Sequence, residues 1–253
     1  KIQETFLPAK VLNIPGVDFA WIYQPCDELG GDGLNVIPLG DGQVAVFVLD
    51  VSGHGVVSAL LSMTLSRLLS PPSQLSSILI RDGLNGQRDI VPPVDVAARL
   101  NELFPFDSAT QQLTTMIYGI LDSTTGKFRY VSAGQPGPVH LPYQADPVLM
   151  NSPGFPIGLT NEVYSERSVC LEAGDRLYLY SDGVTEAMDQ AGNLFGHARL
   201  LETIAQTRSL PLQENVENLI AAIQRWSGSG KSIDDISILA VEMPVAVGGR
   251  WST

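Results

Sequence analysis

The chain has 253 residues, 44% of them hydrophobic and 17% charged, so it is long enough to bury a sizeable core and has the composition of an ordinary globular protein. Its formal net charge of −12 argues against nucleic acid and against an anionic membrane as partners. No apolar run is long enough to span a bilayer, and no signal peptide is visible. The two cysteines have no metal-site spacing, which indicates free thiols in a reducing compartment and predicts a cytoplasmic protein.

Apolar periodicity and turn residues divide the first half of the chain into strands and helices. Six apolar residues run without a break over 44–49, which is typical of a strand buried on both faces. The predicted elements are, in order, strands over 17–23, 34–39 and 43–49, a helix over 54–69, an irregular mobile loop over 73–93 and a helix over 94–104.

The helix predicted over 54–69 carries two different stripes. One stripe is apolar and consists of Val57, Leu60, Leu61, Leu65 and Leu68. The other is made of small polar residues, Ser58, Ser62 and Ser66. Serines at this spacing either mark close packing against a neighbour or form a polar face. We favour the polar face, with the apolar stripe turned to the core.

The second half of the chain predicts mainly strands, followed by two amphipathic helices and a last strand. Neither an internal repeat nor a break in composition divides the sequence, so we predict a single domain over 1–253. Within it, residues 1–9 are expected to be the end of an upstream linker and 244–253 a loose tail. The predicted elements are strands over 114–121, 127–132, 139–141, 148–150, 164–171 and 176–180, helices over 194–207 and 212–226, and a strand over 236–241.

Five aspartates lie at the ends of predicted strands. Asp50 and Asp182 each follow an apolar strand, Asp234 and Asp235 precede one, and Asp32 follows two glycines just before another. Taken singly, each is also ordinary turn chemistry. Strands can bring such ends to one edge of a sheet, where like charges would repel unless a cation neutralised them. A ligand set made only of oxygens favours Mg²⁺, Mn²⁺ or Ca²⁺ over zinc.

Several short motifs carry a family resemblance. They are GGD at 30–32, DVSGHG at 50–55, SAGQP at 132–136, YSDGVTEA at 180–187 and DDIS at 234–237. GGD and DDIS are weak signals alone, whereas DVSGHG is strong and the ordered set is highly specific. Together they resemble the metal-dependent protein phosphatases, also called PPM or type 2C, in their bacterial SpoIIE-like branch. The resemblance covers nearly the whole chain, and QETFLP at 3–8 is similar to the opening of that branch.

The resemblance implies an α+β fold, a four-layer α-β-β-α sandwich of two antiparallel sheets flanked by helices. It also implies two Mn²⁺ or Mg²⁺ ions at one edge. Asp50 would bridge both ions with help from the Val51 carbonyl, and Asp32 would hold one of them. Asp182 and Asp234 would hold the other. Asp235 stays an alternative to Asp234, although the family pattern favours the first aspartate of the pair.

The activity implied is hydrolysis of phosphoserine or phosphothreonine on a regulatory protein, such as an anti-sigma-factor antagonist, by a water that two metals activate. Two residues are candidates for the chemistry, Asp50 at the metals and His54. The His54 ring either protonates the leaving oxygen or only hydrogen-bonds its own turn. The same resemblance implies an upstream receiver or sensor domain, as in a response regulator. A homodimer stays open.

Two positions depart from the family pattern. Asn35 stands where the branch often has a second acid after GGD, and Gln135 stands where AGH is usual. Neither change removes an expected ligand, but both keep an alternative open, a pseudophosphatase that binds its partner without turnover. A second alternative is a structural module stabilised by Ca²⁺, which would bind Ca²⁺ tightly and hydrolyse nothing.

Overall fold

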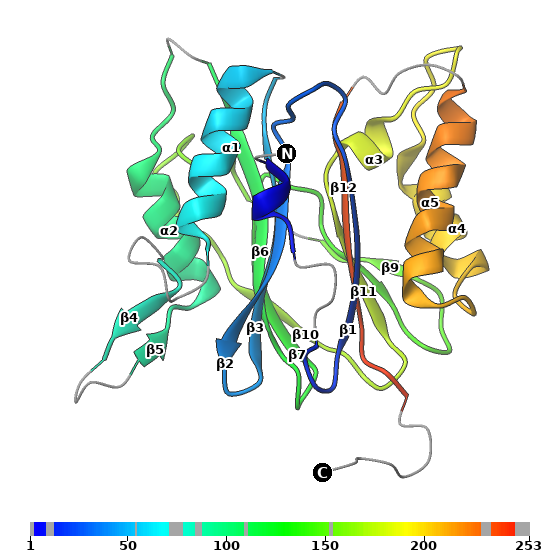
Figure 1. The fold of residues 1–253 in the computed structure, drawn as a ribbon, viewed down its shortest axis with the longest axis horizontal. Coiled ribbons are helices and arrows are strands. Elements are labelled where there is room, and N and C mark those ends of the chain that lie inside the picture. Colours follow the sequence, from blue (N-terminus) through cyan, green and yellow to red (C-terminus); the bar gives the residue numbers. More distant parts are fainter. Residues whose placement is uncertain are drawn as a thin grey trace.

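The computed structural model confirms the sandwich, with two five-stranded antiparallel sheets packed face to face and helices on the two outer faces (Figure 1). The chain is therefore α+β with the layer order α-β-β-α. The structure describes residues 3–8, 13–53, 55–70, 78–83, 88–108, 111–151, 154–228 and 234–245, without the side chains of Glu4 and Asp82.

The first sheet has the order β10-β7-β6-β3-β2, and two helices cover its outer face. A large apolar cluster, which includes Phe47, Leu65, Leu100 and Tyr118, fills the space between this sheet and its helices. The strands are β2 (Gly33–Gly40), β3 (Gln43–Val51), β6 (Thr114–Asp122), β7 (Lys127–Ala133) and β10 (Arg167–Cys170), and the helices are α1 (Val56–Leu68) and α2 (Pro93–Leu103).

The second sheet has the order β1-β12-β11-β8-β9, so the strands nearest the two ends of the chain pair with each other. The outer face of this sheet is covered by two longer helices and one short one, and Val216, Leu219 and Ile238 are buried between these layers. The strands are β1 (Asp18–Gln24), β8 (Val139–Leu141), β9 (Val148–Leu149), β11 (Arg176–Tyr180) and β12 (Ile236–Glu242), and the helices are α3 (Gly183–Glu186), α4 (Gly196–Gln206) and α5 (Leu212–Ser227).

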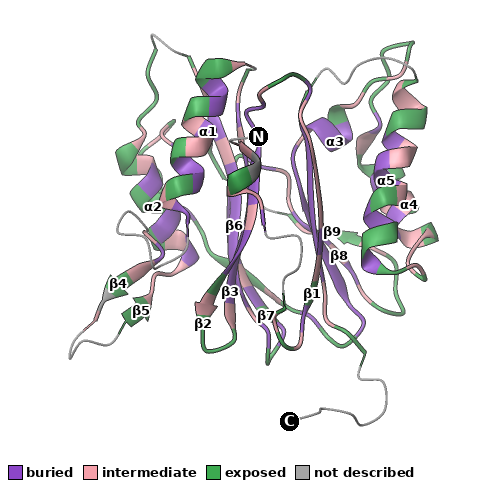
Figure 2. Cartoon of the chain, viewed as in Figure 1, coloured by how far each residue is buried: buried purple, intermediate pink, exposed green. Residues whose placement is uncertain are grey.

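Strand β3 is buried on both faces, as its unbroken apolar run predicts (Figure 2). Val46 and Val48 point to the cluster between the two sheets, where they meet Leu239 of β12. Phe47 and Leu49 point the other way, to the cluster under α1 and α2. Strand β3 is thus fixed on both sides up to Asp50, which makes its end a rigid place for a functional group.

The predicted orientation of α1 is only partly right: Leu65 is buried and Leu61 and Leu68 pack against the core, but the serines face inward as well. Ser58, Ser62 and Ser66 are buried, whereas Val57 and Leu60 are 61% and 55% exposed. The reason is close packing, because a Cβ on Gly33 of β2 would lie only 3.0 Å from Oγ of Ser66 and 3.2 Å from Oγ of Ser62. The sequence alternative that the serines mark close packing is the one that the structure confirms.

Smaller differences concern short elements. Within the region predicted as an irregular loop, β4 (Ile80–Asp82) pairs with β5 (Arg88–Ile90). The strand predicted over 164–171 is shorter and covers only β10. The helix α3 and the 3₁₀ helix η1 (Gln3–Phe6) were not predicted, since four-residue helices leave little periodicity to detect. Among the described residues, no helix combines the length and apolar character needed to cross a membrane.

Candidate metal centre and active site

Asp32 and Asp50 meet at one end of the first sheet. In the hairpin of β2 and β3, Gly33 pairs with Leu49, which places Asp32 beside Asp50. The backbone N–H of Val51 donates to the carbonyl of Gly31 at 3.2 Å, so this pairing continues into the loop. A Cβ on Gly31 would collide with the Val51 carbonyl oxygen, and glycine is therefore required for this approach. The loop and the strand end form one unit around the two carboxylates.

Asp182 and Asp234 come from the second sheet, where β11 ends and β12 begins. The backbone N–H of Ser181 donates to the carbonyl of Ser237 at 3.0 Å, and the N–H of Ser237 donates back to Oγ of Ser181 at 3.0 Å. Asp182 then leads directly into α3. A Cβ on Gly183 would collide with the carbonyl of Asp235, so only glycine permits this contact between the two segments.

Asp235 joins the two halves of the edge. Its Oδ1 accepts a hydrogen bond from the Cys26 N–H at 2.7 Å, and its Oδ2 accepts one from the Asp32 N–H at 3.2 Å. The residue is only 3% exposed, whereas the neighbouring Asp234 is exposed. A carboxylate already engaged by two backbone donors is suited to positioning the Asp32 loop, which leaves Asp234 as the better candidate ligand. The Asp-Asp doublet is the only sequence signal for this division of roles.

Burial and mutual repulsion raise the pKa values of these carboxyls. Burial, and then the charge of Asp50, raises the pKa of Asp32 well above its usual value. Burial raises the pKa of Asp50 to about 8, with further contributions from Asp182 and Asp234. Burial and Asp234 raise the pKa of Asp182 to about 6. The four aspartates are therefore within electrostatic reach of one another, and a bound cation would favour their ionised forms.

The donor set fits a hard divalent cation. Oδ2 of Asp32 is buried and has no hydrogen-bond partner among the described residues, and such an atom needs a counterpart. Carboxylate oxygens are the ligands that Mg²⁺ and Mn²⁺ prefer. Within the described part of the chain, no three Asp, Glu, His or Cys side chains form a ready-made metal cluster. The aspartates share one edge of the sandwich, but their side chains do not converge on a single point.

The remaining predicted site residues have different surroundings. His54 lies outside the described residues. Val51 is fully buried at the end of β3. Asn35 points away from the acids, since its Nδ2 donates to the Phe6 carbonyl at 2.8 Å. Gln135 is buried, and its Oε1 accepts a hydrogen bond from the Thr115 hydroxyl at 2.9 Å. Thr115 is the residue of β6 that pairs with Asp50. Neither departure from the family pattern displaces an aspartate.

An open hollow of about 540 Å³ lies beside Asp182. Part of its wall is the loop after β7, and Glu186 of α3 and His197 of α4 complete one side. It has the size of a site for a small molecule or for one peptide side chain with its neighbours. The sequence did not predict this hollow, because its walls come from segments far apart in the chain.

The two-sheet sandwich with aspartates at one edge defines the structural class of the chain, and the comparison of its sequence with known families gives the family. The profile of the family described as "Stage II sporulation protein E (SpoIIE)" matches residues 40–244, and the chain belongs to this family. Among curated relatives, Protein IcfG of Synechocystis is 26% identical over 95% of this chain and 40% of its own length. Phosphoserine phosphatase RsbP of Bacillus subtilis is 24% identical over 96% of this chain and 56% of its own length. The chain thus spans about half the length of these relatives.

Solved structures share the fold. The SiaA-PP2C domain of Pseudomonas aeruginosa is 20% identical and superposes with a TM-score of 0.77, over 95% of this chain and 92% of that one. The catalytic domain of the serine/threonine protein phosphatase PstP is more distant, with 12% identity and a TM-score of 0.57 over 90% of this chain and 99% of that one. That structure was solved in complex with two manganese ions. Both likenesses establish the architecture.

Proposed function

We propose that this chain is a metal-dependent protein serine/threonine phosphatase. The observation that carries the proposal is the meeting of Asp32, Asp50, Asp182 and Asp234 at one edge of the sandwich, together with a buried Asp32 oxygen that finds no hydrogen-bond partner in the described part of the chain. Membership of the SpoIIE family and similarity to a phosphoserine phosphatase support the reaction type. The manganese ions of PstP support the choice of cation.

We infer the following roles. Two Mn²⁺ or Mg²⁺ ions would supply Lewis acidity and an acidified water for attack on phosphorus. Asp50, with the Val51 carbonyl, would hold both ions, Asp32 one of them, and Asp182 and Asp234 the other. Asp235 keeps Asp32 in place by accepting a hydrogen bond from the Asp32 N–H, while its other oxygen accepts one from the Cys26 N–H. His54 remains a candidate for protonating the leaving oxygen.

The hollow beside Asp182 suits the phosphorylated side chain of a protein substrate and the residues next to it. We infer that the substrate is a phosphorylated regulatory protein of the anti-sigma-factor-antagonist type, and that a receiver or sensor domain upstream controls the activity. The described residues include both cysteines as free thiols, which supports a reducing compartment and hence a cytoplasmic location. A homodimer stays open in this proposal.

The first test is hydrolysis of p-nitrophenyl phosphate with Mn²⁺. Replacing an outer-shell partner of a metal typically costs 10- to 100-fold, so we expect Asp50→Ala and Asp182→Ala, which remove ligands, to lose roughly 100-fold or more. Asp146→Ala is the matched control, because Asp146 is an exposed aspartate in the loop between β8 and β9. It should keep wild-type activity.

This assay, combined with calorimetric titrations of Mn²⁺ and Ca²⁺, separates the alternatives. Turnover that depends on Mn²⁺ and is lost in both ligand variants supports the phosphatase. Mn²⁺ binding without turnover, on this substrate and on a phosphoserine protein, would favour the pseudophosphatase. Tight Ca²⁺ binding without any turnover would favour the structural module.

A further inference from the structure

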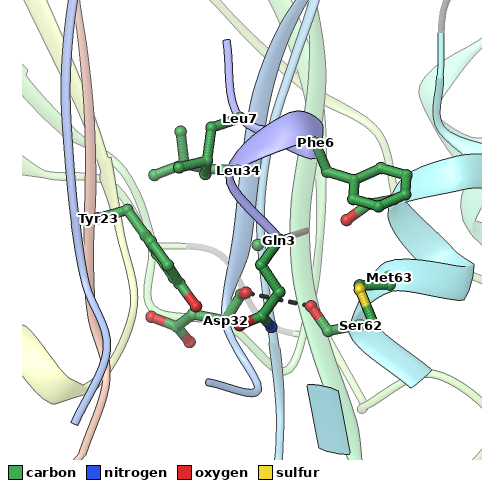
Figure 3. Close-up of a pocket in the computed structure, with 10 residues that line it drawn as sticks. Gln3, Phe6, Leu7, Tyr23, Asp32, Leu34, Ser62 and Met63 are labelled. Atoms are coloured by element: carbon green, nitrogen blue, oxygen red, sulfur yellow. Dashed lines mark hydrogen bonds between the residues drawn. The ribbon is translucent and has the colours of Figure 1, made fainter. Parts of the chain in front are cut away.

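The N-terminal segment 3–8 lies against the loop that carries Asp32. Its 3₁₀ helix η1 sits beside α1. Leu7 faces Leu34 of β2, whereas the Phe6 ring points toward α1 (Figure 3). A hollow of about 10 Å³ remains beneath it, next to Asp32. This is roughly the least space that one buried water needs, so the segment packs almost flush against the loop.

One side chain connects this segment to the loop. Nε2 of Gln3 donates to the Gly30 carbonyl at 2.7 Å, and the Gly30 N–H donates to Oε1 of Gln3 at 3.2 Å. A single amide thus occupies both polar groups of the Gly30 backbone, as a neighbouring strand would do in a sheet. The segment has a second anchor where Nδ2 of Asn35 donates to the Phe6 carbonyl.

The rest of the loop is held by the body of the domain. The Val51 N–H holds the Gly31 carbonyl. The Asp32 carbonyl accepts from Oγ of Ser62 at 3.1 Å, and the Asp32 N–H donates to Asp235. Gln3 therefore fixes the residue at which the chain enters this loop, two positions before the carboxylate that the proposed function assigns to a cation.

We propose that Gln3 is a positioning residue for divalent-cation binding. This inference rests on the proposed function only through the assignment of Asp32 as a ligand. A loop that is fixed before the cation arrives loses less conformational freedom on binding, so its affinity is higher. Gln3 does not reach the substrate hollow, so its effect falls on the cation and not on the turnover of the loaded enzyme. Displacing segment 3–8 lowers cation affinity in the same way.

The test uses Gln3→Met, which keeps the length of the side chain and removes both hydrogen bonds. The matched control is Gln43→Met, because Nε2 of Gln43 donates to Asp122 at the opposite end of β3. Calorimetric titration with Mn²⁺ measures Kd directly, and p-nitrophenyl phosphate hydrolysis at saturating Mn²⁺ measures kcat. We expect Kd to rise about five- to tenfold in Gln3→Met, with kcat within about twofold of wild type. Gln43→Met should change neither quantity.

A second variant protects the test against poor folding of the first. Asn35→Ala releases the segment at Phe6 and should raise the Mn²⁺ Kd by a smaller factor. Amide hydrogen exchange should show faster exchange at Gly30 in both variants and not in Gln43→Met. An unchanged Kd in Gln3→Met would overturn the inference, and so would an equal rise of Kd in Gln43→Met. If Gln3→Met does not fold, an unchanged Kd in Asn35→Ala would overturn it instead. If the wild-type chain binds Mn²⁺ but hydrolyses nothing, the proposed function fails and the titrations still decide the role of Gln3.

Discussion

The helices α1 and α5 cover opposite faces of the sandwich and pack on their sheets in different ways. Helix α5 turns Val216, Leu219 and Ile223 to its sheet, and each is at most 1% exposed. Helix α1 turns its serines inward and leaves Val57 and Leu60 in the open. The ordinary rule, apolar inside and polar outside, describes the apolar side chains of α5 but only part of α1, where Leu65 is buried together with the serines.

The difference follows from what each helix lies on. Leucine and isoleucine side chains separate α5 from its sheet, which gives a core of normal thickness. Ser62 and Ser66 let α1 approach Gly33 closely, and Oγ of Ser62 then reaches the Asp32 carbonyl. At this point, small serine side chains stand between the helix and the sheet where larger apolar side chains would be usual. The helix beside the candidate site therefore helps to position the Asp32 loop, whereas the distant helix contributes mainly to stability.

The largest expected effect is on α5. Leu219→Ala should lower the free energy of unfolding by about 2–5 kcal/mol, because it leaves a cavity in a filled core. Leu60→Ala makes the same change on the exposed face of α1 and should stay within about 0.5 kcal/mol of wild type. Urea unfolding in the absence of metal measures both. Equal losses in the two variants would contradict the described orientation of α1.

Ser62→Leu should cause a smaller loss of stability than Leu219→Ala and should also affect Mn²⁺ binding. Overpacking against Gly33 should cost about 1–3 kcal/mol. The loss of the hydrogen bond to the Asp32 carbonyl should also weaken Mn²⁺ binding, which Leu219→Ala should not do in its folded form. Urea unfolding and Mn²⁺ titration together check this prediction. Loss of stability with wild-type Mn²⁺ affinity would mean that α1 supports the fold only.

Removing the cation should make the stability of the protein depend on pH, because the carboxyls of the acidic edge then lack a counter-charge. In the metal-free protein the folded pKa values of Asp50 and Asp182 are raised, to about 8 and about 6. A raised folded pKa gives stability that is present below the unfolded value near 4 and is lost as the pH rises through the folded value. The metal-free protein should therefore become less stable from pH 5 to pH 8, by about 1 kcal/mol or more. Saturating Mn²⁺ should abolish or reverse the trend in thermal unfolding. Equal slopes with and without EDTA would argue against a cation at these residues.

Much of this architecture was accessible from the sequence. An uninterrupted apolar run predicted β3, and the order of five motifs predicted the sandwich and one shared edge for the four aspartates. The inward serines of α1 were not predicted, because a helical pattern shows two faces but not the distance to the neighbouring sheet. Gln3 and Asp235 act on residues distant in the sequence, and no local pattern encodes such contacts. His54 remains a prediction from the motif alone.

The pairing of β1 with β12 has a consequence for how this protein is made. Asp18 is paired with Glu242, so one sheet needs both ends of the domain before it can form. The acidic edge has the same requirement, because Asp235 holds the N–H groups of Cys26 and Asp32. On the ribosome, β2, β3 and α1 emerge long before Asp234 does. The nascent chain must therefore wait for its last strand, and a product truncated before Asp234 would lack one candidate ligand, the Asp235 anchor and the strand that joins β1 to β11.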